Sequence, residues 1–250
     1  MAPSSLGSVF LPLDDSAVTR VLAVAAHPDD LDFGAAGTVS QWTDAGVEVT
    51  YLLCTRGDQG GFDDTPREDM PLLRETEQRA AAKAVGVTDV RFLDGFRDGW
   101  LEPGHDLQRE IVRVIRQVRP DRMLIQSPER NWDRIGASHP DHLAAGEASI
   151  RAVYPAARNP FAYPELLQAE GLEAWIVKEV WLMADPSASH VVDITATFGR
   201  KLEALHAHRS QTSHMDDLEG MLRMWGERTA QANGLPEGTL AEVFRIVTTG

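Results

Sequence analysis

The chain of 250 residues contains a single cysteine, Cys54, so no disulfide can form within it. It also has no apolar run near the roughly 18 to 20 residues that a membrane-spanning helix needs. The segment from Met1 to Ser16 lacks the basic start and apolar centre of a signal peptide. These absences fit a reducing compartment, and we expect a cytoplasmic protein without membrane insertion.

Basic residues are scarce as well. The chain has 24 Lys and Arg against 38 Asp and Glu, which gives a formal net charge of −14. Repulsion at that charge argues against nucleic acid and against anionic membrane surfaces as partners. It places no restriction on a neutral, sugar-like substrate. The hydrophobic content of 43% is ordinary, so a chain of this length can bury a large core without disulfides or a metal.

Short apolar runs alternate with amphipathic segments along the chain, without an internal repeat or a linker. We expect a single domain over residues 1–250 in which residues 1–18 are a lead-in of low order. Strands are expected at 21–26, 47–55, 90–93, 123–126, 180–183 and 191–194, with a last edge strand at 243–247. Helices are expected at 33–45, 68–85, 107–118, 140–154, 197–208 and 217–231. This alternation predicts an α/β fold with a mostly parallel sheet covered on both faces.

Two short boxes carry the chemistry. Residues 26–30 read Ala-His-Pro-Asp-Asp, and residues 139–142 read His-Pro-Asp-His. Each box follows an expected buried strand, the first directly and the second after a polar loop. Ligands of parallel sheets bind beyond the carboxyl ends of the strands, so we expect the two boxes to share one site.

The residue types in these boxes are those that bind zinc or a similar divalent ion. Two imidazoles and one carboxylate would leave open positions for water and substrate, as in a hydrolase. A further carboxylate could then accept a proton, and a further histidine could support a developing oxyanion or protonate the leaving group. Taken singly, each histidine could be a turn residue and each aspartate a helix cap. We interpret Asp141 as an acidic residue in the first turn of a helix, where the helix dipole favours it.

Together the boxes resemble those of the PIG-L/LmbE-like deacetylases. This family includes enzymes that deacetylate N-acetylglucosaminyl-phosphatidylinositol and the deacetylases of mycothiol and bacillithiol biosynthesis. The resemblance covers most of the chain, and it implies a Rossmann-like three-layer α/β sandwich. Weaker echoes of the family lie at residues 55–60, 74–77, 98–99, 119–121 and 208–211.

The resemblance implies a role for each residue of the boxes. His27, Asp30 and His142 would bind one Zn²⁺ per chain, although iron, cobalt or nickel would suit the same ligands. Asp29 would be the general base, and His139 would support the transition state. Family members often assemble into trimers or hexamers, so a homo-oligomer is possible.

The resemblance also implies two substrate-binding residues, Arg74 and Asp98, which would contact sugar hydroxyls. The plain alternatives are a helix-surface ion pair for Arg74 with Glu77 or Gln78, and an ordinary turn role for Asp98. The glycines of 57–61 could let the backbone approach a ligand or could be merely flexible.

Two positions depart from common family patterns. Leu31 follows the Asp-Asp pair where many members have glutamate, and Asp32 comes one place later. Ala137 stands where the mycothiol enzymes have a tyrosine that helps with the oxyanion, which argues against a mycothiol precursor as substrate. His206, His208 and His214 near a late helix are read as helix C-terminal histidines rather than a second metal site.

The predicted function is a zinc-dependent hydrolase that removes acetyl from an N-acetylated amino sugar or a related small conjugate. An amidase of a thiol conjugate or of a larger acyl group is the nearest alternative. A metallophosphoesterase would need more carboxylates than the boxes supply. A sugar-binding relative without turnover would not need Asp29 and His139.

Overall fold

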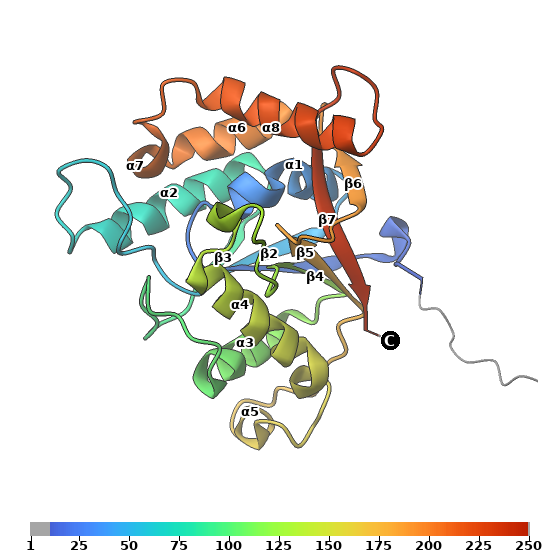
Figure 1. Ribbon diagram of the computed structural model, residues 1–250. Helices are drawn as coiled ribbons and strands as arrows, with labels where there is room; N and C mark the ends of the chain where they lie inside the picture. The colour runs from blue at the N-terminus through green and yellow to red at the C-terminus, as the bar shows by residue number, and fades with distance from the viewer. Residues whose placement is uncertain (1–10, 250) are drawn as a thin grey trace, which may run out of the picture.

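The computed structural model describes residues 11–249, and a seven-stranded sheet runs through its centre in the order β3-β2-β1-β4-β5-β7-β6 (Figure 1). The first five strands in this order are parallel, and β7 is antiparallel to both β5 and β6. The predicted mostly parallel sheet is therefore confirmed. The strands are β1 (Arg20–Ala25), β2 (Glu48–Leu53), β3 (Asp89–Phe92), β4 (Arg122–Gln126), β5 (Glu179–Met183), β6 (His190–Asp193) and β7 (Ala241–Thr248).

Helices cover both faces of this sheet. The helices α1, α2, α6 and α8 lie on one side, and α3, α4 and the short α5 lie on the other (Figure 1). Their bounds are α1 (Asp30–Asp44), α2 (Met70–Ala84), α3 (His105–Val118), α4 (Pro140–Arg151), α5 (Pro164–Gln168), α6 (Phe198–Ala207), α7 (Arg209–Thr212) and α8 (Leu218–Ala232). Two 3₁₀ turns (Asp15–Ala17 and Ile135–Ala137) and a π-helical segment (Ala152–Ala157) complete the described elements. None of the helices within 11–249 has the length and apolar character to span a membrane.

Alternate residues of β1 build the two halves of the core. Leu22 and Val24 pack with α3 and α4, whereas Val21 and Ala23 pack with α1 and α2. Successive side chains of a strand point to opposite faces, so a strand that is covered on both sides must be apolar at every position. This requirement explains the continuous apolar run that predicted β1.

The position of the last strand in the sheet was predicted wrongly. The segment 243–247 was expected at the edge of the sheet, but β7 lies between β5 and β6, and β6 forms that edge. Within β7, Glu242 is buried in an ion pair with Lys201.

The lead-in is also more ordered than expected where it is described. Residues 1–10 lie outside the described part of the chain. Asp15 begins a 3₁₀ turn and forms an ion pair with Arg122 at the start of β4 (2.7 Å). Val18 is buried in the core.

The strand order determines where a site can form. From β1 the chain proceeds outward through β2 to β3, and then returns to place β4 on the other side of β1. The connections after β1 and β4 therefore diverge, with α1 packed on one face and α4 on the other. Such a switch point leaves a crevice at the carboxyl ends of the two strands. The first box begins at this crevice directly after β1, and the second reaches it after the loop that follows β4.

Candidate metal and catalytic site

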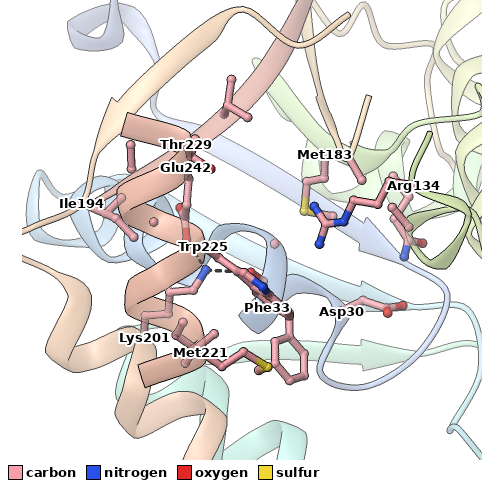
Figure 2. Close-up of a pocket in the computed structure, with 18 of the residues that line it drawn as sticks. Asp30, Phe33, Arg134, Met183, Ile194, Lys201, Met221, Trp225, Thr229 and Glu242 are labelled. Carbon is pink, nitrogen blue, oxygen red and sulfur yellow. Dashed lines mark hydrogen bonds and ion pairs between the residues drawn. The ribbon is translucent and has the colours of Figure 1, made fainter. Parts of the chain in front are cut away.

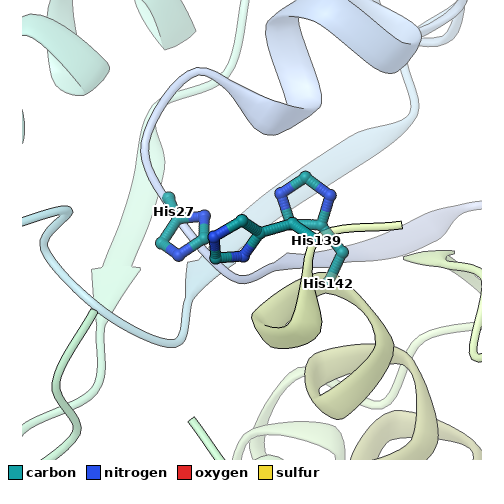
Figure 3. A group of neighbouring side chains, drawn as sticks. All are labelled: His27, His139 and His142. Atoms are coloured by element: carbon teal, nitrogen blue, oxygen red, sulfur yellow. The ribbon is translucent and has the colours of Figure 1, made fainter. Parts of the chain in front are cut away.

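The two boxes meet at the crevice. The rings of His27, His139 and His142 gather there, with centroids 5.2 to 5.5 Å apart (Figure 3). His27 comes from the turn between β1 and α1. His139 and His142 come from the first turn of α4, where Pro140 suits the first helical position. Residues separated by over a hundred positions in the sequence thus form one cluster.

His27 is buried, and both of its ring nitrogens face carboxylates. Nε2 lies 3.0 Å from an oxygen of Asp98 and 3.0 Å from an oxygen of Asp141, and Nδ1 lies 3.4 Å from Asp30. A metal-binding histidine commonly donates its other N–H to a carboxylate, which fixes the tautomer and the ring orientation. With the proton on Nε2, Nδ1 is the nitrogen that is available to a metal, and it faces Asp30.

Asp30 joins His27 to His142. Its Oδ1 lies 2.9 Å from His142 Nε2, and its Oδ2 accepts a hydrogen bond from the His27 backbone N–H (2.7 Å). Ligand atoms at zinc-like bond lengths around a tetrahedral ion lie about 3.3 to 3.6 Å apart. The 3.4 Å between Asp30 Oδ2 and His27 Nδ1 matches that spacing, and the 2.9 Å between Asp30 Oδ1 and His142 Nε2 is a hydrogen-bond distance, so the three side chains are a candidate ligand set.

Electrostatics favour a charged Asp30. Burial alone would raise its pKa, but the imidazoles of His142 and His27 hold the pKa of this carboxyl well below its usual range. Burial also lowers the pKa of His27, yet hydrogen bonds with Asp141, Asp30 and Asp98 raise it well above the usual value. The site therefore concentrates negative charge around His27, as a cation site requires.

Asp141 is a residue whose role the sequence analysis missed. It lies in the first turn of α4, as expected, but its side chain is buried. Its two oxygens accept hydrogen bonds from the backbone N–H groups of Gly99 (2.7 Å) and Leu101 (3.3 Å). Ligand atoms of His27, His139 and His142 lie within 4.8 Å of one another, and so do those of His27, Asp98 and Asp141, so either group could hold a metal ion. However, these backbone bonds leave Asp141 better placed to orient His27 than to bind a metal.

His139 is oriented differently from His142. At the N-terminus of α4, its Nδ1 accepts a hydrogen bond from the Asp141 backbone N–H (3.2 Å), and the residue is exposed. The neutral ring then carries its proton on Nε2, which can donate to a substrate oxygen. Burial and the neighbouring charges of His27 and His142 lower the pKa of His139, which favours this neutral form.

Asp29 has a strained backbone. Its φ of 82° lies in the left-handed region, which costs a non-glycine residue on the order of 1–3 kcal/mol. Its N–H donates to Gln78 Oε1 (2.8 Å), and its carboxylate is paired with Arg74 (2.9 Å). Burial raises the pKa of Asp29 to about 6, and the Arg74 charge opposes that rise. Such strain persists where a site needs a side chain at one particular place.

Arg74 does not form the helix-surface ion pair with Glu77 or Gln78 that was the alternative interpretation. It is buried, and it donates to the carbonyl oxygens of Gly57 (3.0 Å) and Pro28 (2.7 Å) as well as to Asp29. A Cβ at Gly57 or Gly60 would overlap the guanidinium group. These glycines therefore give Arg74 room beside Asp29. Contact between Arg74 and substrate remains a prediction.

A buried chain of polar side chains lies behind Asp29, and the sequence analysis did not find it. Asp32 Oδ2 lies 2.8 Å from Nε2 of His208 and accepts a hydrogen bond from Gln78 Nε2 (2.8 Å). Gln78 in turn accepts the Asp29 N–H. His208 was read as a helix C-terminal residue. Two features of the sequence could have indicated this polar chain, namely the acidic residue at position 32 and the weak family resemblance at 208–211.

Asp98 connects His27 to Gln59, a residue that lines a polar cavity. Its Oδ2 accepts a hydrogen bond from the Gln59 N–H (3.0 Å), while Oδ1 faces His27. The cavity measures about 560 Å³, and Gln59, Arg97 and Trp100 contribute to its wall. Asp98 is therefore more than an ordinary turn residue, although its contact with a sugar hydroxyl remains a prediction.

Comparison with known proteins matches this description. The sequence model of PIG-L, described as GlcNAc-PI de-N-acetylase, matches residues 22–153, which is over half of the chain. That range contains both boxes, Arg74 and Asp98. The chain therefore belongs to the PIG-L family.

Relatives narrow the class to deacetylases, which are hydrolases of amide bonds. The diacetylchitobiose deacetylase of Thermococcus kodakarensis is 34% identical over 201 residues, which cover 80% of this chain and 72% of that protein. The probable N-acetyl-alpha-D-glucosaminyl L-malate deacetylase 2 of Bacillus cereus is 36% identical over 204 residues, 78% of this chain and 85% of that protein.

Solved structures agree on the fold. The N,N'-diacetylchitobiose deacetylase of Pyrococcus horikoshii superposes with a TM-score of 0.84 at 27% identity, over 93% of this chain and 85% of that chain. A 4-carboxy-2-hydroxymuconate hydratase of Pseudomonas putida superposes with a TM-score of 0.74 at 19% identity, covering 93% and 97% of the two chains. Because a hydratase shares the fold, the reaction has to be argued from the site.

Proposed function

We propose that this chain is a zinc-dependent N-deacetylase of an N-acetylated amino sugar or a related small conjugate. The observation that carries the proposal is the position of Asp30 between His27 and His142, next to the strained Asp29. Those three side chains would hold one divalent ion and leave open positions for water and a carbonyl oxygen. The same donor set would accept iron, cobalt or nickel.

A divalent ion at this place would supply Lewis acidity, which polarises the amide carbonyl and lowers the pKa of a water molecule. Asp29 would accept the proton of that water, because its carboxylate is fixed beside the proposed ligands by Arg74 and Gln78. His139 Nε2 would donate a hydrogen bond to the carbonyl oxygen as negative charge develops there. The protonated Asp29 would then return a proton to the departing amine.

The sugar would lie on the Asp98 side of the site. The polar cavity there offers carboxylate and amide groups for hydroxyls, and the ring of Trp100 for a sugar face. The relatives named above act on N-acetylglucosamine conjugates, which supports this class of substrate. Assembly into trimers or hexamers and a cytoplasmic location remain predictions.

The alternatives have less support. A two-metal phosphoesterase would need a bridging carboxylate, and Asp141, the nearest candidate, already accepts two backbone N–H groups and faces His27. A sugar-binding protein without turnover would have no need for a strained carboxylate beside the ligands. Hydrolysis of a larger acyl group would use the same residues and the same chemistry, so it extends the proposal rather than competing with it.

The direct test is acetate release by the zinc-loaded protein from N-acetylglucosamine, diacetylchitobiose and N-acetylglucosaminyl malate. Release from at least one of them should stop after chelation and return when zinc is added. Hydrolysis of p-nitrophenyl phosphate, measured on the same preparation, should be absent. Phosphate release without acetate release would overturn the proposal.

A further inference from the structure

A second cavity of about 400 Å³ adjoins two of the proposed ligands. Asp30 and His142 form part of its wall, and it extends past Phe33 to the inner face of α8 (Figure 2). A methyl group is about as large as a water molecule, whose share of liquid volume is roughly 30 Å³. The methyl group of an acetyl substrate would leave most of this cavity unfilled.

Much of the wall of this cavity is apolar, although Arg134 also lines it, with its guanidinium carbon 5.5 Å from the centroid of the Trp225 ring. Phe33, Met183, Ile194, Met221 and Trp225 contribute side chains from four different parts of the fold. Unbranched methionine side chains adapt to flexible ligands. The wall therefore suits an aliphatic group better than a second sugar.

The buried charges in the wall are already satisfied. Lys201 is paired with Glu242 (2.6 Å) and also donates to the Phe33 carbonyl oxygen (2.7 Å). Glu242 accepts further hydrogen bonds from the backbone N–H groups of Gly37 (3.1 Å) and Thr38 (2.8 Å). This pair is neutral as a unit, so it does not call for a charged ligand.

The polar cavity is lined by segments that follow β2 and β3, and the apolar cavity by residues of β5, β7 and the segment after β6, so β1 and β4 lie between them in the strand order. The path from one to the other runs from Asp98 through His27 and Asp30 to His142. An amide carbonyl carbon carries two substituents that point away from each other, namely the nitrogen with its sugar and the first carbon of the acyl group. With the sugar on the polar side, the acyl group must enter the apolar cavity.

We propose that this cavity is a subsite for an acyl chain longer than acetyl, so that the substrate class includes amino sugars with medium-length N-acyl chains. The inference rests on the proposed function and extends it. The reaction is hydrolysis: the water oxygen bonds to the acyl carbon, the C–N bond breaks, and the amine takes the proton. The products are an aliphatic carboxylate and a free amino sugar.

The first experiment measures kcat/KM of the zinc-loaded protein on glucosamine with N-acetyl, N-butanoyl, N-hexanoyl and N-octanoyl groups, by release of the primary amine. Burial of each methylene should raise kcat/KM about fourfold until the cavity is filled. Equal values for all four chains would overturn the proposal. Faster cleavage of the N-acetyl octyl glycoside, without any gain from N-acyl length, would overturn it too, because the cavity would then hold the aglycone.

Two matched variants of α8 localise the effect. Met221→Trp places a large ring in the cavity and should abolish the rise of kcat/KM with chain length. Met224→Trp makes the same change on the same helix at a residue that is 39% exposed and does not line the cavity. It should preserve the rise. A similar loss in both variants, or in neither, would contradict the assignment.

Binding provides a readout without turnover. Aliphatic hydroxamates carry an acyl chain and no sugar, and titration calorimetry measures their affinity. Their affinity for the zinc-loaded protein should rise from acetohydroxamate to hexanohydroxamate by a similar factor per methylene. Flat affinities alongside acetate release would overturn the acyl subsite and leave the proposed function standing. Rising affinities without cleavage of any N-acyl sugar would support the subsite and refute the proposed function.

Discussion

At the amino ends of the parallel strands, called the first edge below, Arg122 lies between Glu179 and Asp15 (2.7 Å to each). At their carboxyl ends, called the second edge, three carboxylates face a single histidine, His27. Both edges use buried charged side chains. The first edge pairs opposite charges through contacts within the chain, whereas the second gathers like charges.

The difference shows what each edge is for. At the first edge, ion pairs compensate the charges of Arg122 and Glu179 without a ligand, so we expect it to contribute to stability alone. The second edge combines crowded carboxylates with the strained backbone of Asp29. A bound cation would reduce the repulsion between those carboxylates. Active sites commonly sacrifice stability in this way. Changes at the two edges should therefore separate activity from stability.

The largest effect is expected from Asp29→Asn. Loss of the base should reduce kcat by about 10²- to 10⁴-fold, while His27, Asp30 and His142 still hold the metal. The free energy of unfolding of the metal-free protein should stay the same or rise, because a desolvated charge is removed. Steady-state kinetics and urea unfolding test both parts. Full activity in this variant would remove Asp29 from the mechanism, and Asp216→Asn, at an exposed aspartate, is the matched control.

The opposite pattern is expected from Arg122→Met. Removing one partner of a buried ion pair leaves Glu179 uncompensated, which should lower the free energy of unfolding by about 3–5 kcal/mol. The kcat of the folded fraction should not change. Arg151→Met is the control, because Arg151 is 51% exposed in its ion pair with Glu147 and should contribute at most about 1 kcal/mol. Equal losses of stability in the two variants would remove the distinction between the edges.

A smaller effect on activity is expected from Gln78→Leu. This residue holds the Asp29 backbone without touching the reacting position, so it is a positioning residue. We expect kcat to fall about 10- to 100-fold with little change in KM or metal content. The control is Gln231→Leu at an exposed position of α8. A change confined to KM would instead indicate that Gln78 contacts the substrate.

The smallest effect is a pH dependence at the first edge. Burial alone would raise the pKa of Asp121, but hydrogen bonds from Thr19, Lys178 and Arg20 lower it from 3.8 to about 2. A depressed folded-state pKa contributes stability that is complete above about pH 4 and is lost as pH falls towards 2. Urea unfolding between pH 2 and pH 5 should therefore show a weaker acid dependence in Asp121→Asn than in the parent chain. Identical curves would contradict this.

The sequence predicted the features that depend on residues close together in the chain. Continuous apolar runs at 21–26 and 123–125 indicated strands buried on both faces, and the two boxes could be read from their residue types. The expectation that the boxes would meet followed from their positions after strands, since the carboxyl ends of parallel strands share one edge.

What the sequence could not show depends on partners far away along the chain. Arg74 reaches Asp29 across 45 positions, and Asp32 meets His208 across 176. Neither pair leaves a periodic signal. The placement of β7 inside the sheet and the apolar cavity likewise depend on how separate elements pack, which no local pattern records.

The most direct test of the account is the metal content per chain of the purified, zinc-reconstituted protein, measured beside His142→Ala and Asp29→Asn. The account predicts one equivalent in the parent chain, a large loss in His142→Ala, and one equivalent in Asp29→Asn. Two equivalents in the parent chain, or no bound metal after reconstitution, would contradict the mononuclear site on which the proposed mechanism depends.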